Sequence, residues 1–548
     1  MKELQHAPTQ TRVVSVAAFA AMVLAAFYMS VQIADEALHN SDILYAPSFI
    51  GDLWTGFTVT GWALTPAPYF LPDLFLYGLV DALLRVFSLS AADRIDIGLR
   101  LVAVIINVGC GVLFVSLLRR VVLIRKELLY LSWAVITFLF TIIPVIGQIF
   151  LSAHILTNHA GILLMWFGFW IFWLSESPVR YLALLVLVVS LISDGQSVPL
   201  LVLPSMTMSF VGLFKKKVRW HSLVDLILVA LTWYTSVRLL VRIRYQLVYY
   251  PIVGNDQVLD RLMSVDHLWL QFITGMATDS GVLLSLGIIF FLCVSILISL
   301  RSPIVINDRR PLIVSFLASI FGVGMALLLH IALTMGIDDA EEIPIRYLHF
   351  ITIIPLPFAV VLLMARIDSR FDIAALFRQL NRLGLWLVLG VEVAGCILIM
   401  CSMAGRGSHS QAMKEVDCVL SMFASEGIQS NETVYGVSDY WQAKRMSVFS
   451  DGRMRLLPVT AAMPDKLYFW ITNIAWFDRP VKYQFAVLTS LKADLFEETY
   501  GPPKIRQSCA GIELWWYGQS SPIVHRPADI QKFAESIAVP YRPGVKQN

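Results

Sequence analysis

The sequence is poor in charge and in cysteine, and it lacks the motifs of the common soluble enzymes. Charged residues make up 15% of its 548 residues, and the formal net charge is only +3. The basic residues form no stripe, which excludes nucleic acid as a partner. No phosphate-binding glycine loop, Ser-His-Asp signature or Cys/His metal pattern is present, which argues against ATP-driven pumps and most classes of soluble enzyme.

The cysteines are few and show no metal-ligand spacing. Four of them lie in or near apolar runs, as small core residues do: Cys110, Cys293, Cys396 and Cys401. Cys418 and Cys509 lie in the polar C-terminal part, where an oxidising compartment would allow them to pair. That disulfide would close a loop of roughly 90 residues, which the chain-entropy model values at about 4 to 5 kcal/mol.

Long apolar runs are what the sequence has in abundance. Hydrophobic residues make up 57% of the chain and the mean hydropathy is +0.70, which is typical of polytopic membrane proteins. About eleven runs are long enough to span the hydrocarbon core as helices. They lie near residues 13–34, 98–118, 128–148, 158–175, 179–193, 197–213, 221–241, 280–300, 311–335, 347–365 and 383–402. Residues 179–213 form either two helices or one broken helix, because their connection is very short.

Arginines and lysines collect in alternate connections and indicate the orientation. The basic connections hold Arg119, Arg120, Arg125 and Lys126; Lys215, Lys216, Lys217 and Arg219; Arg301, Arg309 and Arg310; and Arg366, Arg370, Arg378 and Arg382. With the N-terminus inside and about eleven crossings, all of these connections face the cytoplasm. The first run is too long for the apolar part of a signal peptide, so we expect it to be retained as a helix.

The composition divides the chain into two predicted domains. Residues 1–403 form a transmembrane domain with an outer first loop, 35–97, and residues 404–548 form a small extracytoplasmic α/β domain. Within the second domain, periodicity predicts helices near 411–425 and 439–447 and strands near 433–437, 454–460, 467–474, 484–489 and 511–517. The predicted fold class is therefore a polytopic α-helical membrane protein with an α/β C-terminal domain.

The first loop is the most polar stretch between apolar runs. It carries the acidic residues Asp35, Glu36, Asp42 and Asp52 among aromatic residues and prolines, so it cannot lie in lipid. Acids beside aromatics at a lipid boundary are typical of a site for a polar substrate, whereas the alternative is a solvated loop. A carboxylate there could accept the proton of a hydroxyl group as a general base.

Other ionisable residues are expected at the outer ends of the helices. Arginine and histidine side chains would neutralise a phosphate leaving group, and the candidates are Arg346, His154, His159 and Arg244. The candidates for other substrate contacts are Asp52, Asp194, Tyr45 and Tyr347. These features fit the joining of a hydroxyl acceptor to a sugar carried on a lipid phosphate. The alternatives are interfacial histidines whose hydrogen bonds are satisfied, and snorkelling or anchoring side chains at the membrane surface.

This layout resembles the GT-C superfamily of membrane glycosyltransferases, to which lipid A aminoarabinose transferases and protein mannosyltransferases belong. Two positions match the early first-loop acids of that superfamily: Asp35-Glu36 directly after the first helix, and Asp42 in Asn40-Ser41-Asp42. The resemblance implies transfer of a sugar from a polyprenyl-phosphate donor to an extracytoplasmic glycan, lipid or protein acceptor. Asp42 is the favoured base, because Asp35 is placed to cap or end the helix.

The resemblance also bears on metal use and location. We expect no metal site, and a divalent cation held by Asp52 or Asp194 is the alternative that the resemblance leaves open. The retained helix and compact loops fit a bacterial inner membrane, with the active site on the extracytoplasmic side. Two rival functions are a transporter or flippase for a lipid-linked or polar solute, and a membrane scaffold for the C-terminal domain. The sequence shows no internal repeat, and its acids lie at helix ends, which favours the enzyme.

Overall fold

The computed structural model describes residues 8–56, 61–64, 67–121, 126–143, 150–157, 159–175, 178–215, 218–244, 310–334, 354, 411–460, 463–477, 482–525, 529–530 and 532. The chain forms two compact units. The helical unit comprises Met1–Ile33, Arg100–Val237 and Val253–Gly405, and the sheet unit comprises Ala34–Leu99, Arg238–Ile252 and Arg406–Asn548. The predicted domains placed the first loop with the membrane helices, whereas here it belongs to the same compact unit as the C-terminal residues.

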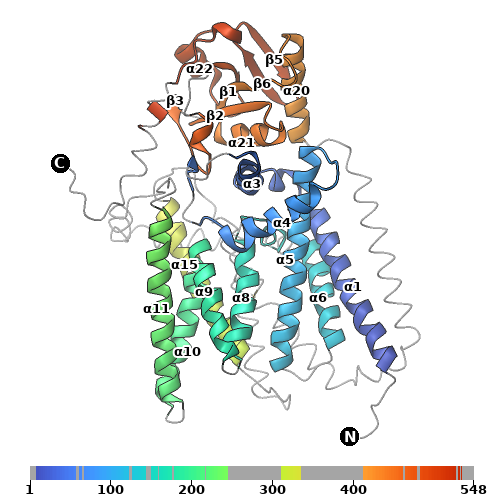
Figure 1. Ribbon diagram of the computed structural model, residues 1–548, viewed down its shortest axis with the longest axis vertical. Coiled ribbons are helices and arrows are strands. Elements are labelled where there is room, and N and C mark those ends of the chain that lie inside the picture. The colour runs from blue at the N-terminus through green and yellow to red at the C-terminus, as the bar shows by residue number, and fades with distance from the viewer. Residues whose placement is uncertain are drawn as a thin grey trace, which may run out of the picture. The chain divides into compact units, whose positions relative to one another are not determined.

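The predicted apolar runs within the described residues fold as helices (Figure 1). These are α1 (Pro8–Gln32), α5 (Ala91–Val121), α6 (Lys126–Ile142), α8 (Ala160–Trp173), α9 (Leu182–Ser193), α10 (Leu203–Leu213), α11 (Arg219–Arg244) and α15 (Arg310–Thr334). The first residues of α5, up to Leu99, and the last residues of α11, from Arg238, belong to the sheet unit. The predicted runs near 280–300 and 383–402, and all of 347–365 except Ile354, lie outside the described residues.

Three helices in the described part of the chain are long and apolar enough to cross a membrane. They are Ser15–Gln32, Ala91–Val121 and Arg219–Leu240. Several shorter apolar helices accompany them, including Ala160–Trp173 and Val198–Leu213. A run of about 20 apolar residues is what the hydrocarbon core requires of a spanning helix. The helical unit is therefore that of a membrane protein by length and composition.

The sequence left open whether residues 179–213 form two helices or one broken helix, and the backbone conformation decides between them. A short 3₁₀ turn, η3 (Val179–Tyr181), precedes helix α9, which ends at Ser193. Asp194 is extended, with φ −149° and ψ 120°, so it cannot continue the helix. A π-helical turn, η4 (Val198–Val202), then leads into α10. Residues 179–213 thus contain two helices separated by a break at Asp194.

The sheet unit contains a six-stranded sheet in its described residues, with strand order β3-β2-β1-β4-β6-β5. The strands are β1 (Val434–Asp439), β2 (Met454–Thr460), β3 (Met463–Leu467), β4 (Tyr483–Val487), β5 (Ile505–Cys509) and β6 (Ile512–Trp516). Strand β1 is parallel to both β2 and β4, and the other pairs are antiparallel. The chain leaves β1 toward β2 and later returns to its other side as β4, so the order reverses at β1.

Helices α20 (Gln411–Ser425), α21 (Tyr440–Phe449) and α22 (Ala493–Tyr500) complete this part of the unit (Figure 1). The predicted helices near 411–425 and 439–447 are confirmed, as are the strands near 433–437, 454–460, 484–489 and 511–517. Helix α22 and strands β3 and β5 were not predicted. Strand β5 lies at the sheet edge and most of its side chains are exposed, so it lacks the apolar alternation of a half-buried strand.

The predicted strand at 467–474 is wrong. Strand β3 ends at Leu467, and the next residue, Tyr468, still donates its N–H to Pro458 O of β2 at 2.9 Å. Beyond Tyr468, the backbone pairs with the first loop: Ala63 N donates to Thr472 O at 3.0 Å, and Trp62 forms an isolated antiparallel bridge with Asn473. Phe469, Ile471 and Ile474 are buried although they belong to no strand, and periodicity alone could not distinguish this burial from that of a strand.

The first loop is folded rather than solvated. It forms α2 (Asp35–Leu38), α3 (Tyr45–Thr55), a π-helical turn η2 (Phe70–Leu74) and α4 (Phe75–Leu84). Helix α3 buries the side chains of Tyr45 to Ile50, and also Asp52. It ends at Gly56, whose φ of 77° is a left-handed conformation that glycine adopts without strain.

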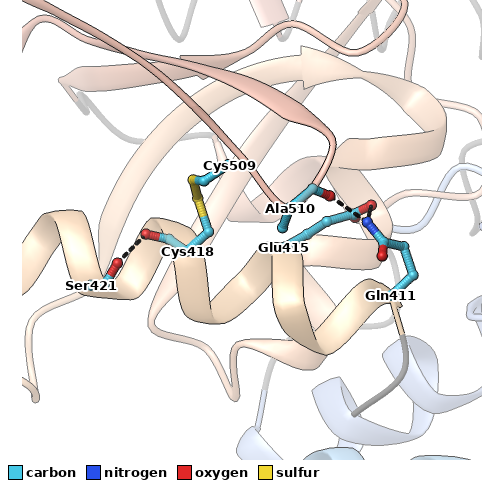
Figure 2. Close-up of a disulfide and its surroundings, with 6 residues drawn as sticks. All are labelled: Gln411, Glu415, Cys418, Ser421, Cys509 and Ala510. Atoms are coloured by element: carbon cyan, nitrogen blue, oxygen red, sulfur yellow. Dashed lines mark hydrogen bonds between the residues drawn. A yellow bond between two sulfur atoms is a disulfide. The ribbon is translucent and has the colours of Figure 1, made fainter.

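A disulfide joins Cys418 in α20 to Cys509 at the end of β5 (Figure 2). These are the two cysteines that the sequence analysis paired. In the same view, Gln411 Nε2 at the start of α20 donates to the carbonyl oxygen of Ala510, in the turn between β5 and β6. The helix that opens the C-terminal part is thus attached to the far edge of the sheet by one covalent bond and one hydrogen bond.

Candidate functional site

A cluster of charged and aromatic side chains lies where the first loop contacts helix α21, within the sheet unit. The Tyr440 hydroxyl donates a hydrogen bond to Asp42 Oδ1 at 2.7 Å, across 398 positions of sequence. Ser41 Oγ donates to the carbonyl oxygen of Trp441 at 2.6 Å. These two bonds fix the segment that carries the favoured base against the first turn of α21.

The ammonium group of Lys444 is buried in this cluster. The Lys444 side chain is 3% exposed, and its Nζ has no hydrogen-bond partner among the described residues. The Nζ atom lies 5.2 Å from the ring centroid of Trp62 and 5.7 Å from that of Tyr440. Burial lowers the pKa of Lys444 to about 7, and the carboxylates of Asp42 and Asp52 oppose this shift. We call Asp42, Tyr440, Lys444, Trp62 and Asp52 the Lys444 cluster.

Asp52 is the buried carboxylate of the Lys444 cluster. Its carboxylate accepts hydrogen bonds from Asn473 Nδ2 at 2.6 Å, Trp476 Nε1 at 3.0 Å and Trp62 Nε1 at 3.1 Å. Burial raises the pKa of Asp52, while these bonds and the positive charge of Arg455 act in the opposite direction. A carboxylate held by three side-chain donors is suited to joining the first loop to the C-terminal residues.

The sequence explains why Tyr440 and Lys444 face the first loop together. Asp439, the last residue of β1, is the N-cap of α21: its Oδ1 accepts from the backbone N–H of Trp441 at 2.9 Å and of Gln442 at 3.3 Å. Tyr440 and Lys444 are then one helical turn apart on the same side of α21. The start of the helix also lies at the carboxyl end of β1, where the strand order reverses. In open α/β sheets, ligands bind at such a position.

The predicted catalytic acids lie in different environments. Asp35 is half-buried in the first turn of α2, and Glu36 beside it is exposed. Asp42 is partly exposed and belongs to the Lys444 cluster. Tyr45, a predicted substrate contact, is fully buried, and its hydroxyl donates to the carbonyl oxygen of Pro68 at 3.1 Å. Among the three acids, Asp42 is the one that is partly exposed and also belongs to the Lys444 cluster.

Two other predicted residues meet in the helical unit. His159 Nδ1 lies 2.6 Å from Asp194 Oδ2, and both side chains are buried. The second oxygen of Asp194 accepts from the backbone N–H of Gln196 at 2.9 Å. Asp194 stands at the break after α9, where a charge near hydrocarbon requires a partner, and His159 supplies it.

His154 lies between the predicted spans 128–148 and 158–175 and is also buried. Its Nδ1 is 2.8 Å from the carbonyl oxygen of Phe150, and its Nε2 is 3.0 Å from Asn107 Nδ2. Burial lowers the pKa of His154 to about 4, so the ring is neutral at physiological pH. A neutral ring with both nitrogens engaged is suited to packing rather than to holding a phosphate.

The remaining predicted phosphate and substrate residues cannot be placed in this geometry. Arg346 and Tyr347 lie outside the described residues, and Arg244 ends helix α11 with its side chain outside them.

An ion-pair network on α4 and α5 was missed by the sequence analysis. Asp81 is buried and accepts from Arg85 Nε at 2.7 Å and from Arg94 Nε at 3.0 Å. The guanidinium carbon of Arg85 also lies 4.9 Å from the ring centroid of Trp54. The spacing of Asp81 and Arg85, which are one helical turn apart, could have indicated the ion pair between them. The contact with Arg94 crosses a turn and left no local signal.

The chain matches no protein-family model and no curated protein. Among solved structures, it is similar to the crystal structure of ArnT from Cupriavidus metallidurans bound to undecaprenyl phosphate. The TM-score is 0.40 and the sequence identity 14%, over 92% of this chain and 98% of that chain. Similarity at this level establishes neither a family nor a function.

The chemistry available at the Lys444 cluster follows from its own residues. A carboxylate at Asp42 can accept a proton, and the Tyr440 hydroxyl holds one of its oxygens in place. The buried ammonium group of Lys444 adds a positive charge to the same cluster. In the described part of the chain, no group of three or more His, Cys, Asp or Glu residues could hold a metal ion.

Proposed function

We propose that this protein is an integral membrane glycosyltransferase that transfers a sugar from a polyprenyl-phosphate donor to an extracytoplasmic glycan, lipid or protein acceptor. Asp42 acts as the general base. The observation that supports this most is the environment of Asp42, a partly exposed first-loop carboxylate bonded to Tyr440 in the Lys444 cluster. The apolar helices of the chain provide the setting in which a long aliphatic carrier would dissolve.

The proposed reaction balances without a cofactor. The acceptor oxygen forms a bond to the anomeric carbon of the sugar while the bond from that carbon to the phosphate oxygen breaks. The phosphate leaves with the electron pair, and the proton of the acceptor hydroxyl passes to the Asp42 carboxylate. General-base catalysis by a positioned side chain contributes roughly 100-fold to 10,000-fold to such a rate.

The charge that develops on the phosphate needs a cation. Because His154 is neutral and His159 is paired with Asp194, the proposal gives this task to the arginines Arg346 and Arg244. Guanidinium groups bind phosphate with two parallel hydrogen bonds and remain charged at all physiological pH values. Asp52 and Tyr45 act in this scheme by supporting the first loop rather than by touching the sugar.

The test is mass spectrometry of surface glycans and lipids from cells that carry the wild type, a deletion or Asp42→Asn at equal protein level. We expect one sugar to be absent from the deletion strain and reduced at least about 100-fold with Asp42→Asn, because the amide cannot accept the proton. The matched control is Asp417→Asn, which removes an exposed carboxylate from α20 of the same unit and should leave the sugar at its wild-type level.

Two results would change the assignment of the base. If Asp42→Asn keeps the sugar while Asp35→Asn or Glu36→Gln loses it, the base lies on α2 instead. If all three variants keep the sugar that the deletion loses, first-loop base catalysis is wrong.

The rival function is a transporter or flippase for a lipid-linked or polar solute. The buried His159–Asp194 pair is the observation that favours it, since ionisable pairs at helix breaks are typical of transport pathways. The same measurement separates the two functions. A transporter predicts that the deletion leaves every glycan chemically intact while a lipid-linked precursor or solute accumulates on one side of the membrane.

A further inference from the structure

We propose that Trp441 is the binding platform for the acceptor: one sugar ring of the acceptor stacks on its indole ring, and a hydroxyl group of that saccharide reaches Asp42. The acceptor group is then a sugar hydroxyl rather than a lipid hydroxyl or an amino-acid side chain. This inference rests on the proposed function, because it requires Asp42 to be the base. It names the class of acceptor and assigns its recognition to the C-terminal residues.

The first argument is the exposure of the Trp441 side chain. Among the described residues from 411 onward, the exposed large apolar side chains are Trp441, Ile505 and Val524, and Trp441 is the aromatic one. Its exposed fraction is 52%, whereas Trp476 of the same unit is buried. Tryptophan is a residue that binding surfaces favour. A single exposed apolar side chain is common, however, so the surroundings of the ring decide its role.

The second argument is the position of Trp441 beside the proposed base. The Tyr440 hydroxyl donates to Asp42 Oδ1 at 2.7 Å, and the centroid of the Tyr440 ring lies 5.0 Å from that of the Trp441 ring. Ser41, the residue before Asp42, donates its hydroxyl to the carbonyl oxygen of Trp441 at 2.6 Å. Two separate hydrogen bonds therefore hold the segment of the base against the start of α21, and a single tyrosine side chain connects the indole ring with the carboxylate.

The third argument is that the indole ring keeps a face for a ligand. The rings of Tyr440 and Trp441 meet in a T-shaped contact with an interplanar angle of 66°. Such a contact covers at most one face of the indole ring. The C–H groups on one side of a sugar ring pack on an aromatic face, while its hydroxyl groups still form hydrogen bonds. Asp42, which is partly exposed, offers a carboxylate to such a hydroxyl.

The place of Trp441 in the fold agrees with a ligand site. It lies in the first turn of α21, directly after the carboxyl end of β1, where the strand order reverses. Ligands of open α/β sheets bind at that position. The backbone N–H of Trp441 donates to the N-cap residue Asp439 at 2.9 Å, so the start of the helix is fixed. The indole ring is therefore attached to a rigid part of the fold.

The surface around Trp441 differs from that of a membrane anchor. Within α21, Trp441 is the single large apolar side chain that is exposed. Helix α4 instead exposes more than half of Phe75, Leu79 and Leu83, which follow one another at helical spacing. A helix that lies on lipid presents such a continuous apolar face. One aromatic ring close to a carboxylate is the pattern of a site that binds a polar ligand.

The experiment begins with the linkage of the transferred sugar. Surface glycans, lipids and proteins from the wild type and the deletion strain are separated and analysed by mass spectrometry, and the group that carries the missing sugar is identified. We expect another sugar, joined through one of its hydroxyl groups, and the fraction that contains it shows whether this saccharide is a lipid-free glycan or part of a glycolipid. Attachment to a lipid hydroxyl or to an amino-acid side chain would overturn the inference and leave the proposed function intact.

The second part measures acceptor binding by the purified protein. The lipid fraction of the deletion strain supplies the donor, and the unmodified acceptor from the same strain is titrated. Trp441→Ala and Trp441→Leu should each raise the KM for the acceptor about 10-fold and change kcat less than about 3-fold, because the ring binds the acceptor before and during the reaction alike. Trp441→Phe, which keeps a flat ring, should stay within about 3-fold of the wild-type KM.

The matched control is Trp54→Ala, which removes a similarly exposed tryptophan from α3 and should leave the KM unchanged. A membrane anchor predicts another order: Trp441→Leu, which stays apolar, would keep the wild-type KM while Trp441→Ala would not. That order would overturn the inference, as would a fall in kcat at unchanged KM or wild-type kinetics in every variant. If Trp441→Ala does not accumulate, Trp441→Gln is read in its place with the same expected rise in KM. A deletion strain that lacks no sugar would instead remove the proposed function, and the inference with it.

Discussion

The helical unit and the sheet unit both contain buried ion pairs, but the sheet unit also contains a buried ammonium group that has no hydrogen bond among the described residues. In the helical unit, Asp194 is paired with His159 at 2.6 Å, and Asp225 with Arg180 at 2.6 Å. In the sheet unit, the ammonium group of Lys444 is buried between rings with no hydrogen bond among the described residues. Charges near hydrocarbon must be paired locally because no water can solvate them. We call a buried ion pair a closed pair, and a buried charge without a hydrogen bond among the described residues an open charge. An open charge is the better indicator of a functional site, because nearly all buried polar groups in proteins have partners.

The same contrast exists within the first loop. Asp52 and Asp42 are acids of one short segment, and both are near Lys444. Asp52 is enclosed by three donors, whereas Asp42 is partly exposed and bonded by a tyrosine hydroxyl. We expect the stability of the sheet unit to depend on Asp52 and sugar transfer to depend on Asp42. The variants below test whether these two roles are separate.

The largest effect on stability is expected from Asp52→Ala. The substitution leaves Trp62 Nε1, Trp476 Nε1 and Asn473 Nδ2 buried without their acceptor. Each unsatisfied buried donor costs about 1 to 3 kcal/mol, so a loss of about 4 kcal/mol is expected for the sheet unit. Thermal unfolding in detergent, followed by tryptophan fluorescence, measures it. Asp417→Ala on the surface of α20 is the control, and an equal melting temperature for both variants would contradict the anchoring role of Asp52.

Sequence patterns predicted the elements of both units better than the contacts between them. Apolar runs located α1, α5 and the other described helices of the helical unit, because a membrane-spanning segment is encoded by local composition. Alternation gave the bounds of β2, Met454–Thr460, without error. Asp42 could be identified as a candidate base from the sequence, because it follows the first predicted helix closely. Its partners Tyr440 and Lys444 could not be, since no local pattern encodes a contact across 398 positions.

The polar helix α21 shows why the site was only partly predictable. In the sequence, Tyr440, Trp441 and Lys444 lie together in the helix predicted near 439–447, and nothing distinguishes which of their side chains are buried. The structure exposes about half of Trp441, at 52%, and buries Lys444. A lysine is rarely buried, so the prior expectation for this residue was the surface.

A smaller effect is expected from breaking the closed pair of the helical unit. Asp194→Ala leaves His159 buried without its carboxylate, and removing one partner of a buried pair costs about 3 kcal/mol. His159→Ala should cost a similar amount. The double variant should cost clearly less than the sum of the two, because the residues are in direct contact. Additive losses in thermal unfolding would mean that the two side chains stabilise the helical unit independently.

The smallest effect is expected from Lys444→Met, and its sign is opposite. The folded pKa of Lys444 is about 7 and its ordinary value is 10.5, so between these pH values the unfolded chain binds a proton that the folded chain has released. Stability from this residue therefore rises with pH across that window, and below it the full penalty of burying the ammonium group remains. Lys444→Met removes the penalty, so the variant should be more stable than the wild type at pH 6 by about 1 to 2 kcal/mol.

The difference between Lys444→Met and the wild type should shrink as the pH rises toward 9, because the wild-type lysine is then neutral in the fold. Thermal unfolding at several pH values measures this, with Lys414→Met as a control that should show no such dependence. A Lys444→Met protein that is less stable than the wild type at pH 6 would place Lys444 with the closed pairs of the helical unit. A variant that is more stable than the wild type at pH 6 would show that burial of the Lys444 ammonium group weakens the fold, which distinguishes this charge from the closed ion pairs.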